Sequence, residues 1–336
     1  MEDTILKVNN LRTHFNLSTG IVKAVDGVNF TLKKGEVLGI VGESGSGKSV
    51  TVSSIMRLLP KPIGKIAGGE ILFEGSDLTK ISEKEMLKIR GKDITMIFQD
   101  PMTSLDPVFT IGHQVIEVIR SHQNIGRKEA EKLAIDAMNM VGIPEAEKRM
   151  NSYPHEFSGG MRQRVIIAMA IVSNPKIIIA DEPTTALDVT VQAQVLDLLK
   201  ELKNKLDTSI ILITHNLGVV WNMCDTVMVM YAGKTVEYAP AKVLYKNPMH
   251  PYTVGLLNSI PKLSGSRDKQ LEAIPGTPPD LRLTGVSCNF CNRCKYAEKI
   301  CNEKAPELIE IEKGHFVACN FQTKDASLFI NKEGGK

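Results

Sequence analysis

A glycine-rich segment carries the clearest chemical signal in this sequence. Its residues are, in order, Gly42, Glu43, Ser44, Gly45, Ser46, Gly47, Lys48 and Ser49. They match the phosphate-loop pattern G-x-x-x-x-G-K-[ST] at every fixed position. Glycines in such a loop allow backbone N–H groups to turn inward around phosphate oxygens, and a helix that starts there adds positive potential. The alternative is a glycine-rich turn that merely joins a strand to a helix.

The residues on either side of this loop predict the elements that phosphate binding requires. The apolar run 37–41 predicts a strand before the loop, and a helix is expected over about 49–59. We therefore expect the whole loop, together with Val50, to bind ATP. Lys48 would pair with the β- and γ-phosphates, and the Ser49 hydroxyl would coordinate Mg²⁺.

Two adjacent carboxylates end a second apolar run. Residues 177–180 predict a buried strand, and Asp181 and Glu182 follow it directly. Because desolvating paired charges is expensive, such an ending indicates a nearby cation. We expect Asp181 to hold Mg²⁺ and Glu182 to orient and deprotonate the attacking water. The pair is a weak signal alone, and its position downstream of Lys48 strengthens it.

At residues 157–164 the sequence FSGGMRQR resembles the signature motif of the ATPase subunits of ABC transporters. Met161 departs mildly from the family, in which glutamine is commonest at that position. Ser158 opens an expected helix, so its hydroxyl and the N–H groups of Gly159 and Gly160 could contact a γ-phosphate. The resemblance implies that this phosphate belongs to ATP on a second ATPase subunit. Apart from this resemblance, Ser158-Gly159-Gly160 before a helix would be interpreted as an ordinary N-cap preceded by a loop.

Four further residues are similar to functional positions of the family. Gln99, at the end of an expected strand over 94–98, would link the Mg²⁺ and water site to a helical insertion and serve as a third Mg²⁺ ligand. His215 would contact the γ-phosphate as a second catalytic residue, and Asp188 would communicate across the dimer. Phe15 is the candidate for stacking on adenine. Each could instead be an ordinary strand-end or core residue.

The periodicity of the sequence suggests an α/β protein. Alternating apolar residues predict strands over 5–8, 22–25, 28–32 and 70–73. Helical spacing follows over 111–122 and 127–140, with Pro144 and Pro154 as breakers. Strands over 177–180 and 210–214 then alternate with a helix over 189–205, which is the rhythm of a parallel sheet. Residues 227–238 predict a hairpin.

The resemblance implies a P-loop NTPase (RecA-like) core with an antiparallel β subdomain, a helical insertion and a small C-terminal cysteine-rich module. We expect an ATPase domain over 1–260, with its helical subdomain at about 101–165. A proline-rich linker is expected over 261–286, the cysteine module over 287–322 and a tail over 323–336.

Five of the six cysteines crowd into 32 residues, namely Cys288, Cys291, Cys294, Cys301 and Cys319. A reducing cytoplasm disfavours structural disulfides, so the cluster indicates a metal site. Spacing similar to that of peptide importers implies a [4Fe–4S] cluster on Cys288, Cys294, Cys301 and Cys319, with Cys291 as an alternative ligand and Zn²⁺ as an alternative metal. The other alternative is a set of free or redox-active thiols. Cys224 stands apart and is expected to be a buried core residue.

Two C-terminal motifs narrow the resemblance. Residues 248–253 (PMHPYT) and 276–279 (GTPP) are similar to the dipeptide/oligopeptide importer branch, which shares much with nickel importers. The branch implies a related second ATPase subunit bound head to tail, two integral membrane permease subunits and an extracellular or periplasmic substrate-binding protein. Other hypotheses are a soluble non-transport ABC ATPase and an iron–sulfur regulatory protein with a vestigial ATPase.

Composition argues against several other classes of protein. A net charge of +3 and the absence of a basic block argue against nucleic-acid binding. No apolar run approaches the ~20 residues of a membrane span, and the first residues lack the pattern of a signal peptide. We therefore expect a protein at the cytoplasmic face of the cell membrane, attached through its partners.

Overall fold

The computed structural model describes residues 3–185, 187–259 and 274–320. The chain forms two compact units, and segments of the two alternate along the sequence. We call the first the helical unit; it comprises the described parts of Met1–Thr4, Leu32–Val37 and Lys80–Ile213. We call the second the P-loop unit; it comprises the described parts of Ile5–Thr31, Leu38–Thr79 and Thr214–Lys336. The glycine-rich loop therefore shares a unit with the cysteine-rich C-terminal region.

The P-loop unit contains an antiparallel sheet with the strand order β2-β1-β4-β5. Its strands are β1 (Thr4–Leu17), β2 (Gly20–Lys33), β4 (Gly64–Phe73) and β5 (Ser76–Asp77). Strand β1 pairs with β4 from Leu6 opposite Phe73 to Phe15 opposite Gly64, with an irregularity between Asn9 and Thr13. Leu6, Val8 and Leu11 of β1 are fully buried, so the sheet has one apolar face that packs into the core of the unit.

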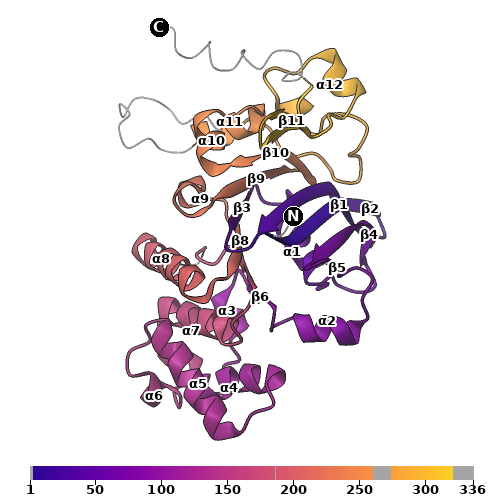
Figure 1. The fold of residues 1–336 in the computed structure, drawn as a ribbon. Coiled ribbons are helices and arrows are strands. Elements are labelled where there is room, and N and C mark those ends of the chain that lie inside the picture. Colours follow the sequence, from indigo (N-terminus) through magenta and orange to yellow (C-terminus); the bar gives the residue numbers. More distant parts are fainter. Residues whose placement is uncertain (1–2, 186, 260–273, 321–336) are drawn as a thin grey trace, which may run out of the picture. The chain divides into compact units, whose positions relative to one another are not determined.

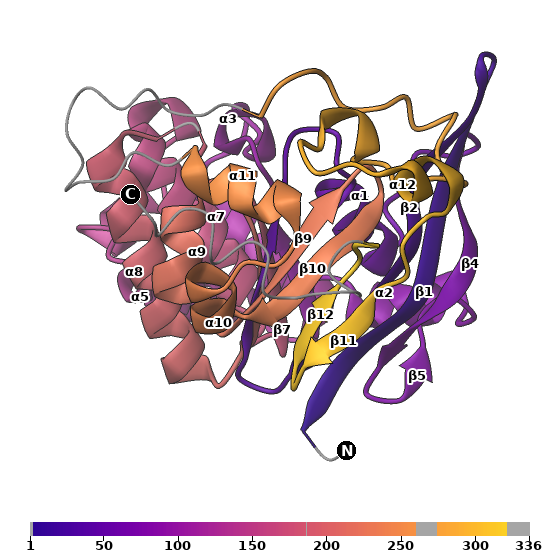
Figure 2. The ribbon, with the colours of Figure 1, turned by 90° about the horizontal axis from the view of Figure 1, so that it is seen from above.

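A second sheet of the P-loop unit connects the glycine-rich loop to the C-terminal region. It contains β3 (Val37–Val41), β9 (Thr226–Tyr231), β10 (Lys234–Pro240), β11 (Ile309–Glu312) and β12 (His315–Val317). Strand β3 is parallel to β9, and β10 pairs antiparallel with both β9 and β12. Figure 2 shows the run β11, β12, β10 and β9 side by side. The C-terminal strands thus extend the sheet that carries the loop.

Short helices complete the P-loop unit. They are α1 (Lys48–Ile55), α9 (Leu217–Met223), α10 (Ala241–Lys246), α11 (Pro251–Asn258) and α12 (Lys299–Glu303), with a 3₁₀ turn at Cys291–Arg293. Helix α10 packs against β9, β10 and α9. Residues 274–286, the described part of the proline-rich segment, contain no helix or strand. Residues 261–273 of the expected linker and 321–336 of the expected module and tail lie outside the described residues.

The helical unit contains three parallel strands, β6 (Ile94–Ile97), β7 (Ile177–Asp181) and β8 (Ser209–Ile213), in the order β8-β7-β6. Its helices are α2 (Glu83–Ile89), α3 (Pro101–Ser104), α4 (Ile111–His122), α5 (Arg127–Met140), α6 (Ala146–Arg149), α7 (Gly159–Ile171) and α8 (Val189–Leu206), with a 3₁₀ turn at Pro154–Glu156. Every residue of β7 and β8 is buried, as expected for parallel strands covered on both faces.

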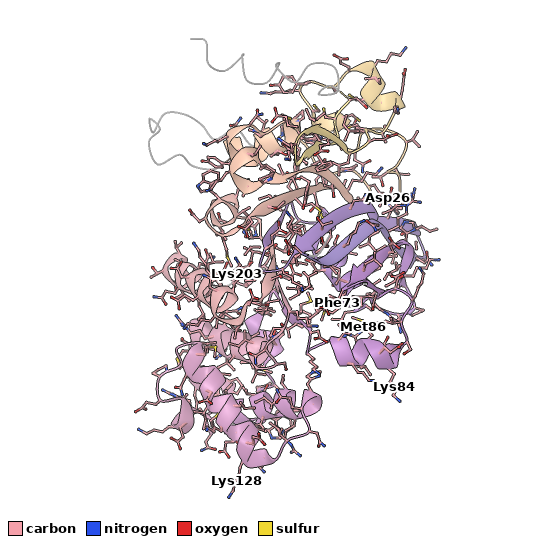
Figure 3. The ribbon with its side chains drawn as sticks, in the orientation of Figure 1. Asp26, Phe73, Lys84, Met86, Lys128 and Lys203 are labelled. Atoms are coloured by element: carbon pink, nitrogen blue, oxygen red, sulfur yellow. The ribbon has the colours of Figure 1, made fainter. Side chains whose placement is uncertain are left out.

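Helices α4, α5 and α7 pack together within the helical unit (Figure 1). Helix α4 buries Ile111, Val115 and Ile119, which share one face at helical spacing. Polar residues take the outer faces of the helices: Lys84 of α2 and Lys128 of α5 extend away from the unit in Figure 3. None of the helices in the described ranges is long and apolar enough to span a membrane.

Most predicted elements are present, and several predicted boundaries are wrong. The helices over 111–122 and 127–140 have the predicted bounds. Helix α1, expected to reach residue 59, ends at Ile55, because Arg57 adopts φ 52° in the left-handed region. The separate strands expected over 22–25 and 28–32 are one strand, β2, which accommodates Gly27 at φ 84°.

A buried carboxylate joins the C-terminal region to the hairpin of β9 and β10. Glu237 of β10 is completely buried. Its Oε1 accepts a hydrogen bond from the Met249 amide at 2.7 Å and lies 2.8 Å from His315 Nε2. Its Oε2 accepts one from the His250 amide at 3.0 Å. A buried carboxylate is tolerated only when such partners satisfy it, so Glu237 fixes three segments at one point.

We predict that Glu237→Gln destabilises the protein by about 2–3 kcal/mol, because the amide would direct a donor at groups that now donate to the carboxylate. Thermal unfolding should show a melting temperature lower by roughly 5 °C or more. Glu312→Gln, at an exposed glutamate of β11, is the matched control and should stay within about 0.5 kcal/mol of the parent. Equal melting temperatures for the two variants would contradict this assignment.

Candidate nucleotide-binding site

The backbone of the glycine-rich loop requires glycine at two positions. Gly42 has φ 154° and Gly47 has φ 102°. A Cβ atom on Gly42 would lie 2.2 Å from the carbonyl oxygen of Met230, and one on Gly47 would lie 2.4 Å from that of Ala24. Neither distance is compatible with a side chain. The loop can therefore approach neighbouring backbone closely enough to curl its amide groups inward.

Lys48 spans the interior of this loop. Its side chain is buried, and its Nζ donates to the carbonyl oxygens of Gly42 and Glu43 at 2.9 and 3.0 Å. The Ser46 hydroxyl is also buried and has no hydrogen-bond partner among the described residues. A buried ammonium group and an unsatisfied hydroxyl beside a curled backbone fit a polyphosphate. Ser44, Gly45 and Ser49 are exposed and Val50 is half-buried, so the loop opens to solvent.

The structure holds Glu182 in an unusual conformation at the end of β7. Asp181 is buried, whereas Glu182 is half-buried and has φ 47°. The Glu182 amide donates to the carbonyl oxygen of Ile213 at 2.9 Å. A left-handed glutamate costs free energy, and such residues cluster at functional sites. The hydrogen bond to Ile213 of β8 helps to hold the backbone of Glu182 in this conformation.

Two side chains hold the Glu182 carboxylate. Gln99 Nε2 and Thr185 Oγ1 both donate to Glu182 Oε2, at 3.1 and 2.8 Å. The structure thus brings together Gln99 and Glu182, which are 83 positions apart in the sequence. Sequence reasoning did not select Thr185. The signal was present, because Thr185 lies in the stretch between Glu182 and Asp188.

Ser158 and Asp188 cap two helices of the helical unit. Ser158 Oγ accepts from the Met161 amide at 3.3 Å at the start of α7, and Asp188 Oδ1 accepts from the Val191 amide at 3.0 Å at the start of α8. Ser158 and Gly159 are exposed. A Cβ on Gly160 would lie 2.7 Å from a methyl group of Val191, so this glycine also lets α7 and α8 approach. The role of these residues toward phosphate stays a prediction.

The remaining two candidates of the nucleotide site are less constrained. Phe15 is half-buried on β1, and its ring packs over Gly64, where a Cβ would lie 3.0 Å from Phe15 Cε1. His215 is exposed and directly precedes Asn216, which caps α9. Stacking of Phe15 on adenine and contact of His215 with phosphate stay predictions.

The five clustered cysteines line one narrow cavity of the P-loop unit, together with Phe290, Tyr296 and His250. Burial raises the pKa of Cys288 to about 12 and that of Cys294 to about 11, and the neighbouring thiols add to both shifts. In residues 3–185, 187–259 and 274–320, no three ligand side chains are grouped closely enough to hold a metal ion. Cys224 is buried, as expected.

We predict that Gly47→Ala weakens MgATP binding at least ~10-fold, because the new Cβ would displace the loop from the Ala24 carbonyl. Gly75→Ala is the matched control: Gly75 also has a positive φ of 84°, but a Cβ there meets nothing within 4 Å. Both variants should lose stability of the order of 1 kcal/mol from backbone strain. Titration with a fluorescent ATP analogue, paired with thermal unfolding, separates the two effects, and equal affinities would contradict the prediction.

Two family models match this sequence. The model described as ABC transporter matches residues 25–185. The model described as oligopeptide/dipeptide transporter, C-terminal region, matches residues 236–301. The first covers the glycine-rich loop, the signature motif and the Asp181–Glu182 pair, and the second covers four of the five clustered cysteines.

Relatives and solved structures are similar over much of the chain. The oligopeptide transport ATP-binding protein OppD of Bacillus subtilis (strain 168) is 55% identical over 313 residues, 93% of this chain and 87% of the relative. The dipeptide transport ATP-binding protein DppD of the same strain is 49% identical over 324 residues, 96% of each chain. A dimeric, post-hydrolysis structure of the ATP-binding cassette MJ0796 bound to ADP and Pi has a TM-score of 0.63 at 28% identity, and covers 70% of this chain and 98% of that one. Since both relatives match nearly the whole of this sequence, the chain belongs to the ABC transporter family, in its oligopeptide/dipeptide branch.

Proposed function

We propose that this chain is the ATP-hydrolysing subunit of an importer for oligopeptides or dipeptides. The observation that carries the proposal is the conformation of residues 42–49, in which Gly42 and Gly47 admit no side chain and Lys48 lies buried inside the loop. The names of the relatives, oligopeptide and dipeptide transport ATP-binding proteins, favour peptides over nickel and over a role outside transport.

The proposed reaction is hydrolysis of ATP to ADP and phosphate. The loop amides and Lys48 would bind the phosphates, and Phe15 would stack on the adenine. Ser49, Gln99 and Asp181 are the proposed ligands of Mg²⁺, which supplies charge neutralisation on the phosphates when bound. Oxygen and hydroxyl donors of this kind suit that hard cation.

Glu182 would act as the general base. Its carboxylate would take a proton from water as the water oxygen attacks the γ-phosphorus and the bond to the leaving ADP oxygen breaks. Gln99 and Thr185 both donate to the same carboxylate oxygen of Glu182, and these bonds would orient the base toward its water. His215 would contact the γ-phosphate and support the same step.

A second ATPase subunit would complete each nucleotide site. Ser158 and Gly159 are exposed at the start of α7, and Asp188 is exposed at the start of α8, where a partner's phosphate would meet helix N-termini. The similar cassette MJ0796 has a dimeric structure. We propose a head-to-tail pair with a related subunit, attached at the cytoplasmic face of the membrane to two permease subunits that receive peptides from a binding protein.

We further infer that Cys288, Cys294, Cys301 and Cys319 hold a [4Fe–4S] cluster, with Cys291 as the alternative ligand and Zn²⁺ as the alternative metal. Support comes from the thiols that line a single cavity and from the affinity of four thiolates for either group. Burial raises the pKa of both Cys288 and Cys294. A bound cation would stabilise the thiolate forms of these cysteines. The proposal also requires the cysteines to lie closer together than they do in the structure.

For Glu182→Gln we expect ATP binding to persist, ATP-loaded pairs to accumulate and phosphate release to fall about 100-fold or more, because the amide cannot accept the proton. Glu201→Gln, at an exposed glutamate of α8, is the control and should hydrolyse ATP normally. Phosphate release and size-exclusion chromatography with MgATP provide the readouts. Undiminished hydrolysis would remove Glu182 from this role, and failure to pair would contradict the two-subunit site.

Anaerobically purified protein should contain about four iron atoms and four acid-labile sulfides per chain. Cys301→Ser should lose both, because Cys301 is buried in the cysteine cavity. Cys291→Ser, the matched variant at the proposed spare cysteine, should keep them. One zinc per chain without labile sulfide would replace the iron–sulfur assignment by a zinc site, and absence of any metal would overturn both.

A further inference from the structure

Glu43 occupies a position that the phosphate-loop pattern leaves free, yet the structure uses each of its polar groups. Its amide donates to Tyr252 Oη at 2.8 Å. Its carbonyl oxygen accepts from Lys48 Nζ at 3.0 Å and from the Ser46 amide at 3.2 Å. Glu43 therefore connects Lys48 and Ser46 of the glycine-rich loop to Tyr252, which lies 209 positions further along the chain. A shift of the Glu43 backbone would therefore reach both Lys48 and Ser46.

Arg293 holds the side chain of Glu43. The guanidinium donates in the bidentate manner, from Nη1 to Oε2 at 2.7 Å and from Nη2 to Oε1 at 3.0 Å. The Arg293 side chain is 5% exposed. The carboxylate raises the pKa of the guanidinium further above its usual range, so this cation stays charged at any working pH. The Glu43 side chain is half-buried, and a partly buried bidentate pair of this kind fixes position more than it adds stability.

The same guanidinium also binds the segment that runs past the loop. Nε donates to the Pro275 carbonyl at 2.8 Å, Nη2 to that of Ile274 at 3.3 Å, and Nη1 to Tyr231 Oη at 3.2 Å. All five N–H groups of the guanidinium are thus accounted for. The continuation of this segment, Pro278 and Pro279, lines a cavity of about 200 Å³ with the residues at the start of the loop.

Arg293 belongs to the cysteine cluster by its position in the chain. It ends the 3₁₀ turn Cys291–Arg293, and Cys294 follows it. Phe290, at the start of this turn, packs against the rings of Tyr231 and Tyr252 at centroid distances of 5.1 and 5.4 Å. A rigid fork of donors reaches a fixed carboxylate only if its backbone is fixed. The positions of Cys291 and Cys294 therefore constrain the backbone of Arg293. The Arg293 side chain in turn constrains the side chain of Glu43.

We propose that Arg293 is a positioning residue for the phosphate-binding loop, and that it makes MgATP affinity depend on the arrangement of the C-terminal cysteines. The inference rests on the proposed binding of ATP to residues 42–49. By this inference, the cysteine region supports the glycine-rich loop at Glu43 and so contributes to ATP binding. The effect passes through Glu43 and not through contact of Arg293 with substrate.

The first test compares Arg293→Met, Arg293→Lys, Glu43→Gln and the double variant Arg293→Met/Glu43→Gln. Loss of a coupled support of this kind should raise the dissociation constant for MgATP about 3- to 30-fold. The KM for ATP should rise more than kcat falls. Arg293→Lys should bind MgATP more tightly than Arg293→Met, because lysine keeps the positive charge but cannot form the bidentate contact with Glu43. The double variant should bind no more weakly than the weaker single one, since both changes break one link.

Arg282→Met is the matched control. Arg282 lies in the same C-terminal region but donates to Asp280, two residues away, with Nε to Oδ1 at 2.9 Å. Its MgATP affinity should equal that of the parent. If Arg293→Met does not fold, Glu43→Gln decides alone, because it keeps every contact of Arg293 with residues 274–275 and with Tyr231.

The second test measures hydrogen exchange at the amides of residues 288–294. Because coupling is reciprocal, MgATP should slow exchange there in the parent chain, and the slowing should be smaller in Arg293→Lys and vanish in Glu43→Gln. Unchanged affinity in all Arg293 and Glu43 variants, or additive effects in the double variant, would overturn the inference. If the parent chain itself fails to bind MgATP, the proposed function fails instead, and the two outcomes are distinguishable.

Discussion

The close approach of backbone to backbone around Gly42 and Gly47 is the constraint on which the P-loop unit depends. The loop contacts the carbonyl of Met230 in β9 and that of Ala24 in β2 at distances that exclude any Cβ atom. Hydrogen bonds continue this packing: the Gly233 amide donates to Ser46, and the Asp26 amide donates to Gly233. The two sheets of the unit thus meet at the loop. A cradle fixed in this way binds charge without reorganising at the moment of reaction.

In the helical unit, the constraint is that the Glu182 carboxylate follows the buried strand β7. Strand β7 is buried throughout, and a glutamate that continued its direction would be desolvated at high cost. The left-handed conformation of Glu182 turns the chain at that point, and Gln99 and Thr185 then orient the side chain. Each unit therefore holds its own candidate residues through contacts made within that unit.

Local pattern predicted most of the elements and the residues that carry the motifs. The helices α4 and α5 have apolar residues at helical spacing, and their bounds were predicted correctly. The strands β7 and β8 were found within a residue or two because their apolar runs are bounded by polar residues. By contrast, the end of α1 depends on the backbone conformation of Arg57, which no periodicity reports.

Long-range pairing was beyond sequence reasoning. Glu237 lies in the middle of a strand and would ordinarily face solvent, yet it is buried against groups from two later segments. Arg293 and Glu43 are 250 positions apart, and neither stands at a fixed position of the loop motif. Such pairs are specified by tertiary packing, so their residue types carry no local signal. The sequence therefore identified the motif residues as candidates, but it gave no indication of the contact between Arg293 and Glu43.

The participation of β12 in the sheet of β9 and β10 has a consequence for biosynthesis. The P-loop unit is assembled from residues at the start of the chain and from residues beyond 214, while the helical unit is largely continuous and is synthesised between them. Until the ribosome has released His315–Val317, the free edge of β10 has unpaired backbone groups that could join another strand. During translation the helical unit can thus fold before the sheet of the P-loop unit is complete.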